Sequence, residues 1–385
     1  MTLKTFEVIF WFSLVALFYI YFGYPLILFL TSKLLKPVYT ITPLDKLPFI
    51  TIFIPVHNEE SVIEKKIINA LSLNYPSHLI EIAVASDGST DRTNEIIKRY
   101  TKKGVKVFIN PKNEGKNAII NKYAHLTRGD ILLFTDANAM FSHDSLKNIV
   151  TKFSDPHVGC VGGTLKYSDG ESLSSKGEGF YFRYENILRK LEGLRGNMVG
   201  ANGAIYALRR ELFTPVPPHV PNDFFHPLSV LKKGFYSVFD EKAIAFEKPT
   251  EDQREEFNRR KRIVARSFGT INEINRIYGT FHGRGLFNIV SHKILRWCAF
   301  PIVLTALLAN IFLVGNPIYL FFLGIQIFFF ASGILGYLLT IFGYKVKVFY
   351  IPYYFLLINL AGVSGLYTYF KGEKVIKWKS ASTTR

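Results

Sequence analysis

Residues 49–60 read FITIFIPVHNEE, an apolar and β-branched run typical of a buried strand that ends in polar residues. Alternating strands and helices predict a parallel sheet with right-handed crossovers and helices on both faces. Ligands of such sheets bind beyond the carboxyl ends of the strands, so the polar residues after each strand are the first candidates for a site. Further strands are expected at residues 80–86, 105–110 and 131–135, and helices at residues 59–73, from residue 91, and at 117–127.

The composition points to a protein with lipid-facing surface. Of the 385 residues, 49% are apolar and 15% aromatic, which excludes intrinsic disorder. Lys and Arg number 47 against 30 Asp and Glu, so the formal net charge is +17. The two cysteines, Cys160 and Cys298, are too few for a disulfide framework or a cysteine zinc site. The length allows two or three domains.

Four apolar stretches are long enough to cross a hydrocarbon core of about 30 Å. The first, residues 6–30, contains one acid and no small-residue cleavage site, which favours a retained anchor over a signal peptide. The alternative is that these stretches form the buried helical core of a soluble domain. The other three stretches are residues 294–314, 317–341 and 349–370. The expected domains are an anchor at 1–36, a soluble domain at 37–290 and a C-terminal membrane region with a basic tail at 291–385.

The topology of the membrane region is open. If all four stretches span, the soluble domain and the loop at residues 343–347 share one side, and the basic tail from residue 371 lies on the other. Because positively charged segments favour the cytoplasm, either one stretch lies in the interface or the tail is an exception.

Polar clusters follow each of the expected strands. Residues 113–116 read NEGK, in which a glycine allows close approach to a ligand and a lysine can meet phosphate oxygens. Residues 135–138 read TDAN, and a carboxylate with a second oxygen two residues later can hold Mg²⁺ or Mn²⁺ together with substrate phosphates. Residues 86–93, SDGSTDRT, are also compatible with a simple turn and helix cap.

Taken together and in this order, these clusters resemble the nucleotide-sugar half of family-2 inverting glycosyltransferases of the GT-A type. The similarity is to the membrane-bound, cellulose-synthase-like subset that includes chitin, hyaluronan and poly-N-acetylglucosamine synthases, and it extends over about residues 49–268. It implies an α/β fold: a GT-A, Rossmann-like nucleotide-sugar-binding domain flanked by transmembrane helices.

The resemblance also implies roles for individual residues. Asn138 departs from the second acid of the family's Asp-x-Asp motif, and its amide oxygen brings no negative charge. The implied roles are Pro55, His57 and Glu59 around base and ribose, Asp87 on the uracil or ribose, Lys116 near the nucleotide, and Asp136 with Asn138 on the donor diphosphate and metal.

Further along the chain, residues 221–224, PNDF, resemble the acidic motif that ends in the catalytic base. Transfer with inversion needs a carboxylate to take the proton of the acceptor hydroxyl, and Asp223 is the expected residue. The alternative is that Asn222 and Asp223 only cap a helix at residues 226–233. Residues 200–206 with Arg209 and Arg210 resemble the sugar-pocket loop and strand of the family, or form an ordinary glycine-rich turn.

Residues 259–263, RRKRI, correspond to the Gln-x-x-Arg-Trp motif of processive synthases. Arg262 aligns with the arginine of the motif, but the glutamine and tryptophan are absent, which puts processive polymer synthesis in doubt. Arg262 is expected to stabilise the leaving diphosphate. The alternative is a basic patch on anionic lipid headgroups.

The expected protein is an inverting glycosyltransferase of the cell membrane with its catalytic domain in the cytoplasm. It would use Mg²⁺ or Mn²⁺ to move a sugar from a nucleotide-diphosphate sugar, with a UDP-sugar expected, to a glycan or lipid-linked acceptor in cell-surface polysaccharide synthesis. A nucleotidyltransferase acting on sugar phosphates is an alternative, but its glycine-rich loop with Arg and Lys is absent. A basic, non-enzymatic membrane protein that binds nucleic acid is another, but no aromatic-basic stacking module is evident, so membrane lipids and no nucleic acid are expected as partners.

Overall fold

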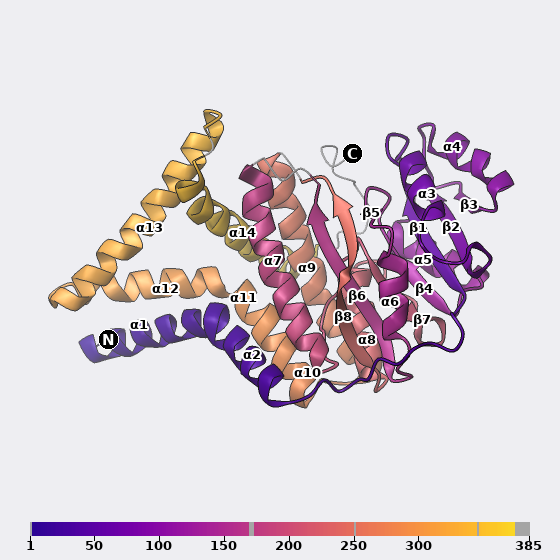
Figure 1. Ribbon diagram of the computed structural model, residues 1–385. Helices are drawn as coiled ribbons and strands as arrows, with labels where there is room; N and C mark the ends of the chain where they lie inside the picture. Colours follow the sequence, from indigo (N-terminus) through magenta and orange to yellow (C-terminus); the bar gives the residue numbers. More distant parts are fainter. Residues whose placement is uncertain (1, 169–172, 250–251, 345, 374–385) are drawn as a thin grey trace.

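Eight strands form one mixed sheet at the centre of the soluble domain, in the order β3-β2-β1-β4-β7-β6-β8-β5 (Figure 1). The computed structural model describes residues 2–168, 173–249, 252–344 and 346–373. The predicted basic tail beyond residue 373 and Lys345 of the predicted loop lie outside the described residues. The strands are β1 (Ile50–Val56), β2 (Ile80–Asp87), β3 (Lys106–Asn110), β4 (Ile131–Phe134), β5 (Met140–Phe141), β6 (Val158–Tyr167), β7 (Tyr206–Arg209) and β8 (Tyr236–Glu247).

The first half of the sheet is parallel, as the sequence predicts. β1 pairs with β2 and β4, and β2 pairs with β3, each in parallel register. The crossover helices are somewhat shorter than predicted: α3 (Ile63–Leu71), α4 (Thr93–Arg99) and α5 (Lys116–Tyr123). The carboxyl ends of β1, β2 and β4 therefore lie at one edge of the sheet.

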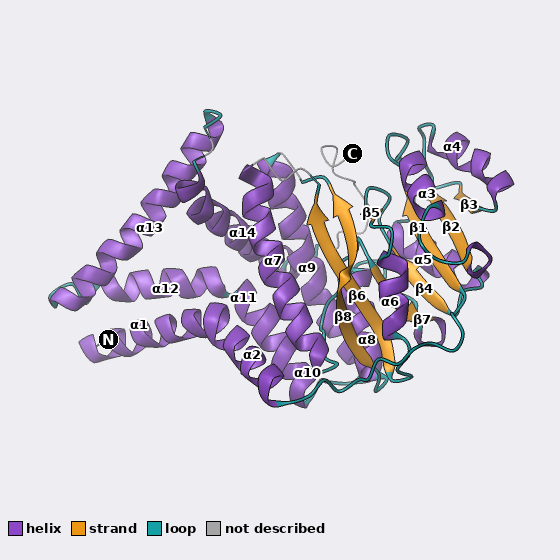
Figure 2. Ribbon diagram, in the orientation of Figure 1, coloured by secondary structure: helices purple, strands orange, loops and turns teal. Residues whose placement is uncertain are grey.

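The second half of the sheet is largely antiparallel, which the sequence does not predict. β7 runs antiparallel to β4, with Phe134 opposite Tyr206, and β6 continues the sheet beyond β7. This register places the loop before β7 beside the carboxyl end of β4. In Figure 2 the long strands β6 and β8 lie beside α7 and α9, and β1 to β4 form the other end of the sheet.

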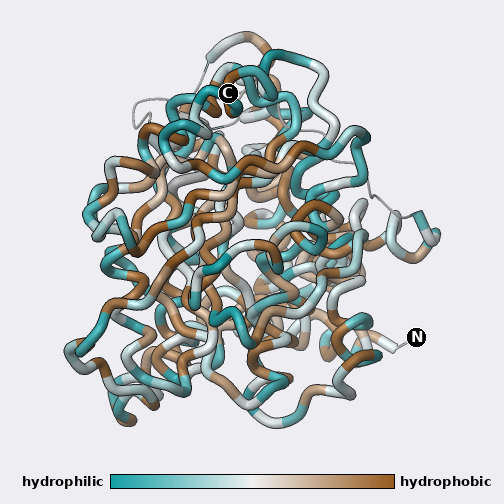
Figure 3. Tube along the Cα trace, turned by 90° about the vertical axis from the view of Figure 1, so that its right-hand side faces the viewer, coloured by the Kyte–Doolittle hydropathy of each residue, from teal (hydrophilic) through white to brown (hydrophobic). Residues whose placement is uncertain are grey.

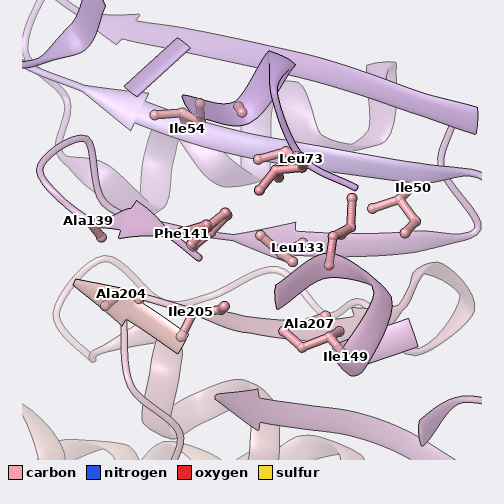
Figure 4. Packing of buried hydrophobic residues seen from close by; sticks show 14 of the residues in the cluster. Ile50, Ile54, Leu73, Leu133, Ala139, Phe141, Ile149, Ala204, Ile205 and Ala207 are labelled. Carbon is pink, nitrogen blue, oxygen red and sulfur yellow. The ribbon is translucent and has the colours of Figure 1, made fainter. Parts of the chain in front are cut away.

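The core of the parallel half is a layer of branched and aromatic side chains between the sheet and its helices. Ile50 and Leu133 from neighbouring strands pack with Phe141, and Ile149 of α6 (Ser145–Lys152) lies over Ala207 (Figure 4). These residues are buried. Burial of each large apolar side chain stabilises the folded state by about 1.5–3 kcal/mol. Figure 3 shows hydrophilic loops at the periphery of this end of the molecule.

Three helices lie between the sheet and the apolar helices that project away from it (Figure 1). They are α7 (Leu173–Leu194), α8 (Asn222–Lys232) and α9 (Gln253–Tyr278). α9 packs along α14 (Lys347–Phe370), so one helix contacts both the soluble domain and a candidate span. The candidate spans therefore lie on one side of the sheet, with α7 and α9 between them and the strands (Figure 1).

Among the described residues, three helical segments are long and apolar enough to cross a membrane, and a bent pair would be a fourth. The three are Leu3–Leu34, comprising α1 (Leu3–Phe18), a π-helical turn and α2 (Tyr24–Leu34), together with α13 (Pro317–Ile341) and α14.

The predicted second stretch, residues 294–314, is bent rather than straight. The helical segment Gly283–Trp297, which includes α10 (Gly283–Asn288) and α11 (Leu295–Trp297), meets α12 (Ala299–Ile311) at 58°. Pro301 explains the break, because proline has no N–H to donate to the carbonyl of Trp297 four residues earlier.

The contact between α14 and α9 requires a glycine. A Cβ on Gly365 would lie 2.6 Å from the carbonyl oxygen of Lys261 and 3.0 Å from the Cβ of Val264. We expect Gly365→Ala to push α14 away from α9 and to destabilise the chain by about 1–3 kcal/mol, as overpacking does. The measurement is the melting temperature of the full chain in detergent.

The control for this variant is Gly324→Ala in α13. A Cβ on Gly324 would meet no atom within 4 Å, so this change should leave the melting temperature unchanged or raise it. Equal melting temperatures for the two variants would contradict the close helix contact.

Candidate functional site

A cavity of about 740 Å³ lies where the carboxyl end of β4 meets α7, α8, α9 and the apolar helices. Of the residues predicted to be catalytic or to bind the nucleotide or the metal, Asp136, Asp223 and Arg262 line it, together with the loop of residues 200–203. The three charged residues come from distant parts of the chain, so the fold brings together a carboxylate pair and a guanidinium that the sequence leaves far apart.

Asp136 stands at the carboxyl end of β4, in a tight turn. The amide of Ala139 donates to the carbonyl of Asp136 at 3.3 Å, which closes the turn that carries Asn138. Lys116, at the start of α5, places its Nζ 2.5 Å from Oδ1 of Asp136. The lysine predicted near the nucleotide and the predicted metal-binding aspartate are therefore direct neighbours.

Asp223 faces the same point as Asp136. A Cβ on Gly203 would lie 3.3 Å from Oδ2 of Asp136 and 3.4 Å from Oδ2 of Asp223. The amide of Ala201 donates to the carbonyl of Asp223 at 2.9 Å, which ties the loop to α8. The absence of a side chain at Gly203 therefore leaves the space between the two carboxylates open.

The helix-capping alternative for Asp223 is wrong, because α8 begins at Asn222 and its N-cap is Pro221. Asp223 lies in the first turn, where the positive end of the helix dipole favours its charge. Burial nevertheless raises the pKa of Asp223, and the charge of Asp136 adds to the rise while Lys116 opposes it. A carboxylate with a raised pKa is a better proton acceptor.

The residues predicted to surround the nucleotide form a linked group beside β1 and β2. The carboxylate of Asp87 accepts from the amides of Glu114 at 2.8 Å and Gly115 at 2.7 Å, and so positions the loop that precedes Lys116. His57 bonds through Nδ1 to the carbonyl of Asp87 at 2.7 Å and through Nε2 to Asn113 at 3.0 Å.

Pro55 and Glu59 complete this group as buried residues. Pro55 lies within β1, and the amide of Glu59 donates to Oγ1 of Thr93 at 2.8 Å. None of Pro55, His57, Glu59, Asp87 or Lys116 is among the described residues that line the cavity. Their contact with a nucleotide stays a prediction.

The arginines of residues 259–263 point inward rather than at a membrane surface. Arg259 and Arg260 each bond to Glu256, with Nε at 2.6 and 2.7 Å from its carboxylate oxygens. Both line the cavity with Arg262. Burial and the charge of Arg259 lower the pKa of Arg262. This placement favours an anionic ligand in the cavity over a patch for lipid headgroups.

The glycine-rich segment before β7 divides into two parts. Residues 200–203 line the cavity, as the resemblance implies. Arg209 and Arg210 instead donate to backbone carbonyls, including those of Val158 at 2.9 Å and Gly129. These two arginines hold neighbouring segments of the domain together and are not in the site.

Lys66 is a residue of the site that sequence reasoning missed. It is fully buried on α3, and its Nζ donates to Oγ1 of Thr135 at 3.0 Å and to the carbonyl of Ala139, 3.5 Å above the ring of Phe141. It thus holds both ends of the turn that carries Asp136. Burial lowers the pKa of Lys66 to about 7. The sequence does mark Lys66, because it lies on the apolar face of the amphipathic helix α3, where a lysine is unusual.

Glu247, at the end of β8, also lines the cavity. Burial and the charge of Asp136 raise the pKa of Glu247 to about 7, with partial opposition from Arg259. No motif marks Glu247, since only the fold of β8 against β6 brings it to the site.

The donor set around Asp136 fits a divalent cation that is shared with a substrate. Asp136 offers one carboxylate and Asn138 one amide oxygen, and Mg²⁺ in proteins is often bound by one or two carboxylates plus substrate phosphates. Within the described ranges, no group of three or more His, Cys, Asp or Glu could hold a metal alone. Any cation here would therefore need the diphosphate of the donor to complete its coordination.

Comparison with known proteins agrees with the geometry. Residues 51–214 match the family model described as glycosyl transferase family 2. A β-monoglucosyldiacylglycerol synthase of Nostoc sp. is 34% identical over 30% of this chain and 25% of its own length. A poly-β-1,6-N-acetyl-D-glucosamine synthase of Staphylococcus aureus is 28% identical over 34% of this chain and 32% of its own. The matches thus span about a quarter to a third of these curated relatives.

A solved structure shares the fold over nearly the whole chain. The mannosyltransferase of Pyrobaculum calidifontis, determined with GDP-Man and Mn²⁺, aligns with a TM-score of 0.68 at 20% identity. The alignment covers 96% of this chain and 99% of that one. The predicted GT-A fold with apolar helices at both ends is confirmed.

The role of Lys66 is testable by substitution. Lys66→Met removes the donor to Thr135 and Ala139 and loosens the turn that carries Asp136. We expect a rise of about tenfold in the half-saturating Mn²⁺ concentration and in the KM for the donor, and a loss of about 1–3 kcal/mol of stability. Lys65→Met, at the exposed neighbouring position, should change neither. An unchanged Mn²⁺ requirement in Lys66→Met would refute the positioning role.

The raised pKa of Glu247 leads us to expect that metal binding depends on pH. Because its pKa is raised to about 7, Glu247 is protonated below that pH and gains a negative charge near Asp136 above it. We expect the half-saturating Mn²⁺ concentration to fall as the pH rises through 7. Glu247→Gln should flatten this dependence, whereas Glu241→Gln on the exposed part of β8 should keep it. The same slope in both variants would exclude Glu247 as its source.

Proposed function

We propose that this chain, which belongs to glycosyl transferase family 2, is an inverting enzyme that moves a sugar from a nucleotide-diphosphate donor to an acceptor at the membrane. The observation that carries the proposal is the meeting of Asp136 and Asp223 at Gly203, on the wall of one cavity. Inversion needs one carboxylate on the side of the diphosphate and a second on the opposite side, where the acceptor hydroxyl attacks.

Asp223 acts as the general base. Its carboxylate takes the proton of the acceptor hydroxyl while that oxygen bonds to the anomeric carbon, and the bond from this carbon to the diphosphate breaks. The raised pKa of Asp223 supports this role, since burial makes the carboxylate more ready to accept a proton. Attack from the side opposite the diphosphate inverts the anomeric centre.

Lys116 and Arg262 stabilise the leaving diphosphate, whose charge grows in the transition state. Asp136 and Asn138 would hold Mg²⁺ or Mn²⁺, and this cation would neutralise charge on the diphosphate when bound. The presence of Mn²⁺ with the Pyrobaculum calidifontis enzyme supports a divalent cation. Lys116 would add a second positive charge, besides that of the cation, beside the oxygen atoms of the donor diphosphate.

The nucleotide is proposed to lie along the group formed by Pro55, His57, Glu59 and Asp87. A UDP-sugar is the proposed donor, on the resemblance of these residues to the family motifs. The solved neighbour holds GDP-Man, so the screen for donors should include both UDP- and GDP-sugars. The proposed acceptor is a glycan or a lipid-linked sugar used in cell-surface glycan synthesis.

The proposed location is the cell membrane, with the catalytic domain on the cytoplasmic side where nucleotide sugars are made. The proposed division is an anchor at residues 1–36, a catalytic domain at 37–290 and a membrane region at 291–385. The candidate spans at both ends of the chain support it.

The proposal is tested by a donor screen with the purified full chain, Mn²⁺ or Mg²⁺, and membranes as acceptor. We expect release of a nucleoside diphosphate from at least one common sugar donor. Asp223→Asn should bind that donor with unchanged affinity and lose about a hundredfold or more in turnover, since general bases contribute roughly that much. Asp45→Asn, at an exposed position, should keep full activity. Full turnover in Asp223→Asn would end the assignment of Asp223 as base.

A further inference from the structure

A second cluster of charges lies in the cavity, on the wall formed by α7 and residues 289–297. Its centre is Glu185 of α7, which is only 2% exposed. Nε2 of His292 lies 3.2 Å and Nζ of Lys293 3.3 Å from one of its carboxylate oxygens, and Arg296 bonds to the other. All four residues line the cavity, outside the carboxylate pair described above.

This cluster carries more positive than negative charge. Arg189 is also 3.5 Å from Glu185, so one carboxylate faces three permanent cations. The charges of Lys293 and Arg296, together with His292, outweigh burial and hold the pKa of Glu185 well below its usual range. The nearby Glu192 is already engaged, since it accepts from Tyr24 at 2.7 Å and bonds to His292 at 2.6 Å. Surplus charge out of water is costly unless an anion pairs with it.

The cluster borders directly on the floor of the catalytic site. Cε of Lys293 lies 3.8 Å from the point where a Cβ on Gly200 would stand, and Gly203 of the same short loop lies between the carboxylates of Asp136 and Asp223. An anion held by Lys293 and Arg296 would therefore lie close to the loop that separates the proposed base from Asp136.

Beyond the cluster the cavity becomes apolar and opens between candidate spans. Its walls there include Tyr21 and Phe22 from Leu3–Leu34, and Ile351 and Phe355 from α14. The rings of Tyr21 and Phe355 lie 5.6 Å apart. Phe22 is 65% and Ile351 48% exposed, so the mouth of the cavity is at the surface that the spans would present to lipid. An occupant of this cavity needs an apolar part at the mouth.

We propose that the acceptor is a membrane lipid whose head group carries a phosphate. This inference rests on the proposed function and names its acceptor class. The phosphate pairs with Lys293 and Arg296, which suit it as charge-assisted donors. The lipid chain leaves along the exposed side chains of Phe22 and Ile351. A hydroxyl of the head group gives its proton to Asp223, its oxygen bonds to the anomeric carbon, and the diphosphate leaves with the electron pair of the broken bond.

The test measures lipid binding without any sugar donor. Trp297 lines the cavity, and the other two tryptophans, Trp11 and Trp378, are replaced by Phe so that Trp297 alone reports. The full chain is placed in maltoside micelles, which contain no phosphate, with chain-brominated phosphatidylglycerol or chain-brominated diacylglycerol, and quenching is followed against lipid fraction. Both lipids offer a hydroxyl, but only phosphatidylglycerol offers a phosphate. We expect it to quench at about tenfold lower fraction, the effect of one or two charge-assisted bonds.

Substitutions assign the preference to the cluster. Lys293→Met, or Lys293→Gln if the first variant does not melt cooperatively, should remove most of the preference for phosphatidylglycerol. Lys190→Met is the control, because Lys190 is an exposed residue of α7 that pairs with Glu241 outside the cavity. Lys190→Met should keep the preference for phosphatidylglycerol. This result would show that the preference comes from the cluster and not from a general attraction of anionic lipid to a basic protein. Gly362→Leu places a side chain in the apolar part and should weaken quenching by both lipids, since only the carbonyl of Trp297, at 4.0 Å, limits the space there.

Equal quenching by the two lipids, or equal preference in Lys293→Met and Lys190→Met, would overturn the inference. If the donor screen gives Asp223-dependent release of diphosphate while lipid binding shows no preference, the inference fails alone. If phosphatidylglycerol binds selectively but no donor releases diphosphate, the proposed function fails, and the acceptor role fails with it.

Discussion

The antiparallel pairing of β7 with β4 is the constraint that creates the site. Because Phe134 lies opposite Tyr206, the loop that enters β7 crosses the carboxyl end of β4 next to Asp136. The same loop is tied to α8 by the bond from Ala201 to the carbonyl of Asp223. Only a glycine at position 203 leaves the space that both carboxylates face. Strand register, loop and helix start therefore fix two acids that the chain separates by more than eighty residues.

The parallel half of the fold was predictable because its signals are local. Each strand is a short apolar run and each crossover helix is amphipathic, so pattern alone identifies β1 to β4. The antiparallel half was not, since its pairing joins β5 to β8 across about a hundred residues. The site divides in the same way. Asp136 and Asp223 stand in recognisable motifs, whereas Glu247 has no local signal and becomes part of the cavity only through tertiary structure.

Buried charge is organised around a few acids in this molecule. Glu256 pairs with Arg259 and Arg260, Glu185 with the cations of residues 292–296, and Asp136 with Lys116. Each acid reduces the cost of bringing cations out of water, and that cost would otherwise be several kcal/mol per ion. The ion pairs also hold these cations in fixed positions. The diphosphate of the proposed donor would be stabilised by such preorganised charge, because no reorganisation is needed as negative charge develops.

The apolar helices are walls of the site as well as candidate spans. α9 contributes the cavity arginines on one side and contacts Gly365 of α14 through the carbonyl of Lys261 on the other. On the N-terminal side, Pro25 cannot bond to the carbonyl of Tyr21, and the hydroxyl of Tyr184 on α7 donates to that oxygen at 3.2 Å. Both apolar ends of the chain are thus tied to the helices that carry the charged lining. Movement of either apolar end would therefore change the shape of the cavity.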